Sequence, residues 1–285
     1  MEILSVELTH EGIRMTICIA SVCEKKYVIV AADRMITVTL PNIEYEQTTP
    51  KITQITNNCV AATAGSALAY TPIFREARAE IEKASVTDIG QIVDHTKNAY
   101  IKMRNKKVDE QILASIGLNL TSFYQMNQAL QPSIAQALLQ SISKFNYALW
   151  ILIGGVDDNG GHIFRMENPG RYECFDVIGF HAIGSGEHHA ISTFIANEFE
   201  SNIDLKHGLA ITFEAKKRSE KATGVGPQTD ICIVQKDKVT QLPQAMIAEL
   251  EKTYQEKIKS EKKSRADVDA LINALDLNSL LGKKI

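Results

Sequence analysis

The order of hydrophobic patterns along this 285-residue chain predicts an α+β fold in which two stacked sheets lie between outer helices. Three observations support this fold class. Short β-branched runs are joined by tight polar turns, as in antiparallel hairpins. Apolar residues then recur at helical spacing over two successive segments, and strands followed by two helices come a second time before a closing strand. Each antiparallel sheet needs one covered face, so stacked sheets with helices outside satisfy all of these segments.

The first third of the chain is predicted to contain two hairpins followed by two helices. The runs MTICIASV and YVIVAAD are joined by the polar turn CEKK, and the runs KITQI and CVAATAG are joined by TNN. Over residues 68–84 apolar residues recur at helical spacing. Thr87 or Asp88 can then cap a second helix that continues towards Lys107.

The rest of the main domain repeats this order after a mixed, mostly helical insertion over residues 114–143. Strands are predicted at YALWILIGGVD, HIFRME, RYECFDV and FHAIGSG, with DNGG as the turn between the first two. Helices follow over residues 187–200 and 205–221, and TDICIVQ is the closing strand. We therefore predict an α+β domain over residues 16–242.

Beyond Pro243 the sequence predicts a helical C-terminal extension over residues 243–285. Its first part, EKTYQEKIKSEKKSR, is charge-rich and helix-forming, and VDALINALDLNSLL is amphipathic. The charged part is most simply a solvated face. The amphipathic part needs an apolar partner, in the same subunit or in a neighbouring one.

Composition and charge argue against several classes of protein. The chain is 45% hydrophobic and 23% charged, as ordinary globular domains are, and its net charge of −3 gives no support for a nucleic-acid or anionic-membrane partner. No apolar run approaches the roughly 18 residues that span a bilayer. The five cysteines lie mostly in apolar runs without a CxxC or Cys/His metal spacing. We therefore expect a cytoplasmic protein with reduced cysteines, no metal and no cofactor.

Read from Thr16, the stretch TICIASVC-EKKY-VIVAADR resembles the mature start of proteasome β-subunits, which are N-terminal-nucleophile (Ntn) hydrolases. The stretches PKITQI, AATAG, LIGGVD, AIGSG and TDICIV resemble further family motifs in the family's order. Each is common by chance, but together, at family-like spacing up to Val234, they make the resemblance specific. It implies a four-layer αββα sandwich and a stand-alone prokaryotic proteasome-like protein, which agrees with the pattern of strands and helices.

The resemblance implies a catalytic set of Thr16, Asp33, Lys51, Gly65 and Ser185. A threonine hydroxyl needs a nearby base, and the free α-amine of an N-terminal threonine, with a pKa of about 7.7–8.0, can serve as one. Lys51 would favour the ionised hydroxyl, and Asp33 would orient Lys51. The Gly65 amide would face the oxyanion, and Ser185 would lie near the nucleophile. Lys51→Ala and Asp33→Asn are expected to lower kcat strongly with folding retained.

The implied function is hydrolysis of peptide or other amide bonds through an acyl-threonine intermediate. Two alternatives remain open: peptide ligation through the same intermediate, and a catalytically inactive proteasome-like structural or interaction module. The chain departs from the family at Ala222 and Val225, which stand where the family often has an aspartate and a serine near the nucleophile. Support for the active amine is therefore missing or supplied differently.

Catalysis requires that Thr16 be the first residue, yet Met15 stands before it where the family usually has glycine, and this argues against self-cleavage. Either Met15 is the true initiator, removed because threonine is small, or residues 1–15 stay attached and Thr16 has no free amine. EGIRM can be encoded with a purine-rich GAGG a few bases before the Met15 codon, like a prokaryotic ribosome-binding sequence. We therefore favour residues 1–15 as a mis-annotated start over a retained leader.

Other candidate sites are weaker. His188 and His189 are adjacent on a helix and point about 100° apart, so they are not expected to share a metal. The stretch VDDNGG lacks the ligand spacing of a calcium loop and is expected to be a hairpin turn. Cys18 lies on the same strand face as Thr16 but has no base in the pattern, so a packing role is expected.

The expected partners are a peptide or protein substrate and further copies of the chain. Proteasome-like domains commonly form rings, so the resemblance implies a homo-oligomer. The insertion at residues 114–143 lies where this fold usually makes ring-to-ring contacts, and it could serve as a substrate lid or a subunit contact. We predict a dimer as the minimal unit, with a closed interface between like surfaces.

Overall fold

The computed structural model describes residues 16–39, 42–48, 50–66 and 68–275. It divides the chain into two compact units, residues 1–242 and residues 243–285. The proposed leader at residues 1–15 lies outside the described residues, as does the end of the amphipathic segment beyond residue 275.

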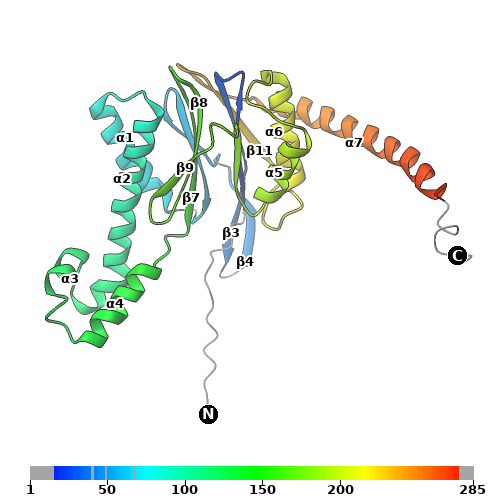
Figure 1. Ribbon diagram of the computed structural model, residues 1–285. Coiled ribbons are helices and arrows are strands. Elements are labelled where there is room, and N and C mark those ends of the chain that lie inside the picture. Colours follow the sequence, from blue (N-terminus) through cyan, green and yellow to red (C-terminus); the bar gives the residue numbers. More distant parts are fainter. Residues whose placement is uncertain (1–15, 40–41, 49, 67, 276–285) are drawn as a thin grey trace, which may run out of the picture. The chain divides into compact units, whose positions relative to one another are not determined.

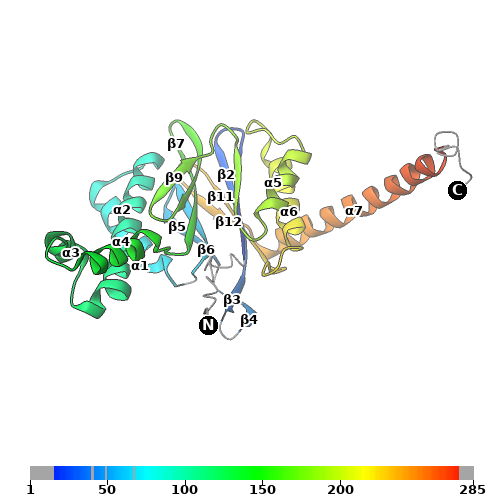
Figure 2. The same ribbon diagram turned by 60° about the horizontal axis from the view of Figure 1, so that its bottom comes forward.

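The first unit contains two stacked antiparallel sheets between two pairs of helices, so the expected αββα sandwich is confirmed (Figures 1 and 2). Helices α5 (Glu187–Ala196) and α6 (Leu205–Ser219) cover the first sheet, and helices α1 (Tyr70–Ala84) and α2 (Ile89–Val108) cover the second. In spatial order, the first sheet consists of β10 (Phe180–Gly184), β1 (Ile17–Cys23), β2 (Tyr27–Asp33), β11 (Thr229–Val234) and β12 (Val239–Gln241). The second consists of β5 (Ile52–Thr56), β6 (Cys59–Gly65), β7 (Leu149–Asp157), β8 (Gly160–Glu167) and β9 (Arg171–Cys174).

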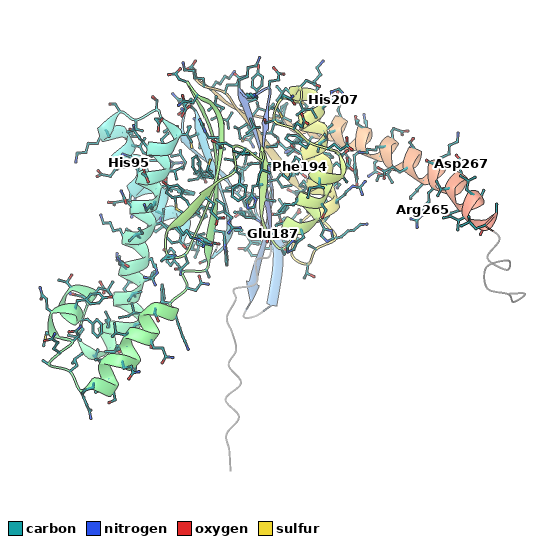
Figure 3. The ribbon with its side chains drawn as sticks, viewed as in Figure 1. His95, Glu187, Phe194, His207, Arg265 and Asp267 are labelled. Carbon is teal, nitrogen blue, oxygen red and sulfur yellow. The ribbon has the colours of Figure 1, made fainter. Side chains whose placement is uncertain are left out.

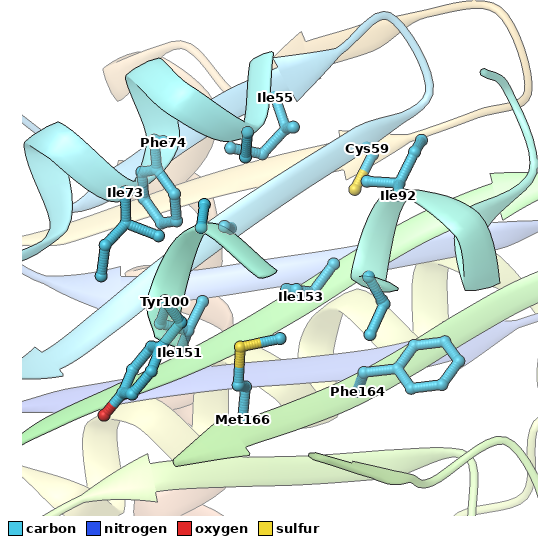
Figure 4. Packing of buried hydrophobic residues seen from close by; sticks show 14 of the residues in the cluster. Ile55, Cys59, Ile73, Phe74, Ile92, Tyr100, Ile151, Ile153, Phe164 and Met166 are labelled. Atoms are coloured by element: carbon cyan, nitrogen blue, oxygen red, sulfur yellow. The ribbon is translucent and has the colours of Figure 1, made fainter. Parts of the chain in front are cut away.

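The near-continuous apolar runs of β6 and β7 arise because these two central strands of the second sheet are buried on both faces. Successive side chains of a strand point to opposite sides. On β6, Val60 faces the core between the sheets and Ala61 faces the helices; on β7, Leu152 and Ile153 divide in the same way. Figure 4 shows the core under the helices, where residues of α1 and α2 pack on the sheet.

Helix α5 covers the first sheet through aromatic contacts. Phe194, labelled in Figure 3, stacks on Phe180 of β10 with ring centroids 4.6 Å apart, and Phe199 meets both rings edge-on. Helix α6 contacts β1 through a hydrogen bond of 2.7 Å between the hydroxyls of Thr212 and Ser21. With the second sheet on its other face, β1 is buried along its whole length.

The helical insertion forms a lobe that begins earlier than expected. Helix α2 runs directly into a π-helical turn at Asp109–Leu113 and a 3₁₀ turn at Ala114–Ile116, before α3 (Leu120–Met126) and α4 (Pro132–Lys144). The lobe has a small core of its own, so Phe123 packs across the helices, whereas Tyr124 and Met126 are exposed. This core consists of Val108, Leu113, Phe123 and Ile142.

The structure differs from the predicted order of elements in three short strands, and it shows which of the two expected residues caps α2. A hairpin of β3 (Met35–Thr39) and β4 (Asn42–Glu46), and strand β12, were not predicted. Strand β3 follows β2 after Arg34 alone, so the pattern shows one extended run rather than two strands. Asp88, not Thr87, caps α2 by accepting a hydrogen bond from the amide of Gln91 at 2.8 Å.

The second unit is described as one helix, α7 (Gln244–Asn273), with a charged middle and an apolar end. Val268, Leu271, Ile272 and Leu275 are exposed and recur at helical spacing, so the described part of the amphipathic segment has the expected stripe. Within the described ranges, no helix has the length and apolar character needed to cross a membrane.

A histidine held between two carboxylates joins several elements of the second sheet. His162 on β8 lies 2.9 Å from Asp157 through Nε2 and 2.6 Å from Asp176 through Nδ1. Asp157 also accepts from the amide of Ile89 at the start of α2. Asp176 and then Asp157 raise the pKa of His162 to about 9, against the opposing effect of burial.

This arrangement predicts a loss of stability at alkaline pH that depends on His162. The folded-state pKa of about 9 lies above the ordinary value of 6.5, so the stabilisation is complete below pH 6.5 and is lost as the pH rises through about 9. Because solvent partly screens the site, we expect about 1–2 kcal/mol of unfolding free energy to be lost in this range. Urea unfolding at both ends of the range should show this loss in the wild type and not in His162→Gln. An equal loss in both proteins would contradict the assignment.

Candidate active site

Three of the five expected site residues meet in one buried cluster. The hydroxyl of Thr16 donates to Asp33 Oδ1 at 2.5 Å and accepts a hydrogen bond from Lys51 Nζ. Lys51 Nζ also donates to Asp33 Oδ1 at 2.7 Å, which closes a triangle of contacts. Thr16 is 3%, Asp33 0% and Lys51 9% exposed, so water screens these charges poorly. The hydroxyl is therefore in direct contact with a hydrogen-bond acceptor and with a lysine ammonium group.

The topology explains how these residues come together. Thr16 precedes β1 and Asp33 ends β2, and the antiparallel register that places Cys18 opposite Ala32 brings both residues to the same end of the hairpin. Lys51 precedes β5 and so comes from the other sheet. The cluster thus joins the two sheets, and its geometry depends on how they stack.

The carboxylate of Asp33 is also held by the main chain. The amide of Ile17 donates to Oδ1 at 3.1 Å, and the amides of Met35 and Gly226 donate to Oδ2 at 3.1 and 3.0 Å. With Thr16 and Lys51, five donors surround this one carboxylate. These hydrogen bonds offset the cost of burying its charge and fix its orientation.

Gly65 lies at the end of β6, beside the start of β1. The thiol of Cys18 donates to the carbonyl of Thr63, two residues before Gly65, at 3.4 Å. Gly65 has a φ of +99°, and a Cβ there would lie 2.2 Å from the carbonyl oxygen of Ala148. Only glycine can therefore bring the backbone through this position.

Ser185 contacts the main chain beside Thr16. Its hydroxyl donates to the carbonyl of Thr223 at 2.8 Å and lies 3.4 Å from the carbonyl oxygen of Thr16. The preceding Gly184 has a φ of +115°, and a Cβ there would lie 2.1 Å from the same Thr16 oxygen. The turn over residues 184–186 therefore packs tightly against Thr16.

Two of the weaker candidates have structural roles in this fold. Burial raises the pKa of the Cys18 thiol to about 12, which disfavours the thiolate, so a packing role fits this residue. The DNGG stretch forms the hairpin turn between β7 and β8, as expected. No group of three His, Cys, Asp or Glu side chains that could hold a metal ion occurs in the part of the chain that the structure describes.

Two charged residues near the site were missed by the sequence analysis. Arg34 binds Asp230 through two hydrogen bonds of 2.7 and 2.5 Å, which ties the end of β2 to β11 directly beside Asp33. Lys216 on α6 is fully buried, and its ammonium group contacts the loop that contains Gly226. Both residues hold the backbone around the carboxylate of Asp33.

A pocket of about 420 Å³ opens beside the segment that follows Gly65. Ser66 lines it, so the pocket begins one residue beyond the glycine. Its other walls come from α1, from the end of α2 and from the segment after α4, so both flanks of the insertion contribute. Among them are the apolar side chains of Leu68, Pro72, Phe145 and Tyr147 and the polar side chains of Lys107 and Gln111.

Two comparisons find similarity to proteasome subunits. The family model described as proteasome subunit matches residues 113–234. This range includes Ser185 but begins after Thr16, Asp33, Lys51 and Gly65. The chain is also 31% identical over 154 residues to the proteasome subunit beta of Ferroglobus placidus (strain DSM 10642 / AEDII12DO), a match that covers 50% of this chain and 71% of that protein.

Proposed function

The chain belongs to the proteasome β-subunit family, and on that premise we propose that it is a threonine amidohydrolase that acts on peptide or other amide bonds. The observation that carries this proposal is the buried contact of the Thr16 hydroxyl with both Lys51 and Asp33. A threonine with a purely structural role does not require contact with both a buried lysine and a buried carboxylate. That combination is suited to activating a weak nucleophile.

The reaction would proceed in two steps with Thr16 as the first residue. Its Oγ1 attacks the substrate carbonyl carbon, the α-amine takes the hydroxyl proton, and the carbonyl electron pair moves to oxygen beside the Gly65 amide. The intermediate then collapses, the C–N bond breaks, and the α-ammonium gives its proton to the leaving amine. Water attacks the resulting acyl-threonine ester with the same base, which releases the acid and restores the hydroxyl.

We further propose that the pocket beside Ser66 binds an apolar side chain of a peptide substrate. Leu68 is 85% exposed at its rim, although it is a large aliphatic side chain. An apolar substrate side chain would cover it and gain roughly 1.5–3 kcal/mol from burial. Lys107 and Gln111 offer hydrogen-bond donors to the peptide on the other walls of the pocket.

Trapping the acyl-enzyme tests this proposal. Protein that starts at Thr16 and protein that starts at Met1 would each be mixed with the activated ester of an N-acetylated peptide ending in an apolar residue. We expect a burst of leaving group, and the acyl mass on the Thr16 peptide, only when Thr16 has a free amine. Adding an amine acceptor then separates hydrolysis from ligation. Absence of acylation in the Thr16-start protein would favour an inactive structural module instead.

We also propose that the protein is a cytoplasmic homo-oligomer with a dimer as the minimal unit. The relative from Ferroglobus placidus is named a subunit, which supports assembly of this chain with further copies. Exposed apolar side chains on the insertion lobe, among them Tyr124 and Met126, are a candidate contact surface between those copies.

A further inference from the structure

A lysine is completely buried in the last turn of α6, next to the proposed active site. Lys216 is 0% exposed, and its Nζ donates to the carbonyls of Gly226 and Pro227 at 2.8 Å each and to Glu220 Oε1 at 2.6 Å. Three acceptors use all three donors of the ammonium group. Burying a lysine is costly, and an apolar side chain would fill the same space at less cost. What lysine provides here and an apolar side chain would not is the pair of hydrogen bonds to the loop carbonyls.

These contacts lead directly to Asp33. Gly226 is held on both sides, because its carbonyl accepts from Lys216 and its amide donates to Asp33 Oδ2 at 3.0 Å. A carboxylate is planar, so the donors on Oδ2 set the direction of Oδ1. Oδ1 in turn meets the hydroxyl of Thr16 and the ammonium group of Lys51.

Two positions of the loop where the family often has polar side chains are apolar in this chain. Ala222 and Val225 stand where proteasome subunits often have an aspartate and a serine, so here the loop offers its main chain. The end of α6 also holds the second loop of the site, since Ser219 Oγ donates to the carbonyl of Gly186 at 3.0 Å. The last turn of α6 thus donates hydrogen bonds to both loops near Thr16, the one that contains Gly226 and the one that contains Gly186.

We propose that Lys216 is a positioning residue for the Thr16 site, acting through the peptide groups of Gly226 and Pro227 on the carboxylate of Asp33. This role rests on the proposed function of Thr16. Burial lowers the pKa of Lys216, but the carboxylate of Glu220 opposes that effect, so the ion pair favours the charged form that donates to both carbonyls.

The test replaces Lys216 with methionine in protein that starts at Thr16, with Lys217→Met as the matched control. Lys217 also pairs with Glu220, at 2.8 Å, so the control removes a neighbouring cation from the same carboxylate. In Lys216→Met, amide exchange over residues 221–228 should accelerate by about tenfold or more, while the sheets stay protected. kcat should fall about 10- to 100-fold with KM within about twofold, because Asp33 moves and the substrate pocket does not. The control should keep both values.

A second variant tests the same connection with Lys216 intact. In Gly226→Ala, the added methyl group would lie 3.0 Å from Met35 Cβ and 2.9 Å from Glu46 Oε1, which displaces this peptide group. We expect the same loss of kcat at unchanged KM. Unchanged exchange and kcat in both variants, or an equal loss in Lys217→Met, would overturn the proposal. If the wild type acylates no substrate, the proposed function fails and the positioning role fails with it, whereas accelerated exchange in Lys216→Met would still show that this lysine holds the loop.

Discussion

Replacing Thr16 with alanine in protein that starts at this residue should lower kcat by at least about 10⁴-fold while the fold is retained. The substitution removes the hydroxyl that contacts Lys51 and Asp33. Within this cluster of three residues, that hydroxyl is the group that can form an acyl ester with the substrate. The two charged residues still pair at 2.7 Å, so no buried charge is left unpaired. Steady-state turnover of a peptide amide, with thermal unfolding measured in parallel, checks both parts of this expectation.

Thr16→Ser is the matched control. Serine keeps the hydroxyl and loses only the methyl group that restricts χ1, so measurable turnover should remain. Wild-type activity in Thr16→Ala would show that the reaction uses a different nucleophile. Cys18 would be a poor replacement, because burial raises the pKa of its thiol to about 12.

The sandwich was predictable from the sequence because β-branched runs joined by polar turns mark its hairpins, and apolar residues at helical spacing mark the helices between them. The approach of Thr16 and Asp33 was also predictable in principle, since both stand at one end of a single hairpin whose short turn fixes the register. Lys51 is different. It comes from the other sheet, and no periodicity states how two sheets stack, so its place in the cluster was expected only through the family resemblance.

The support around Asp33 could not be predicted in the same way. Gly226 lies in the loop between α6 and β11, where neither the helical nor the strand period applies, so no pattern indicates that its amide donates to Asp33. Lys216 did leave a signal: it follows Thr212 by four residues and precedes Ser219 by three, so it occupies the buried stripe of its helix. This position did not indicate a buried lysine from the sequence, because lysines in a helix are usually exposed.

The five donors around Asp33 change the expectation that Asp33→Asn leaves folding intact. An asparagine amide has one acceptor oxygen, and its nitrogen offers two further donors. Some of the groups that now donate to Asp33 would therefore face another donor, and Lys51 would keep its charge without the carboxylate. Removing one partner from a buried ion pair typically costs about 3–5 kcal/mol. Asp33→Asn should therefore lose stability as well as activity.

Lys51→Met should separate the loss of activity from the loss of stability. Asp33 would keep its three main-chain donors and the hydroxyl of Thr16, so we expect the smaller loss of about 1–3 kcal/mol that follows when one partner of a buried hydrogen bond is removed. kcat should nevertheless fall about 10²–10⁴-fold in both variants, because each loses a group that contacts the nucleophile. Urea unfolding and steady-state kinetics on both proteins measure this difference. Equal losses of unfolding free energy would mean that the main-chain amides contribute little to holding Asp33, and that the ion pair alone stabilises its buried charge.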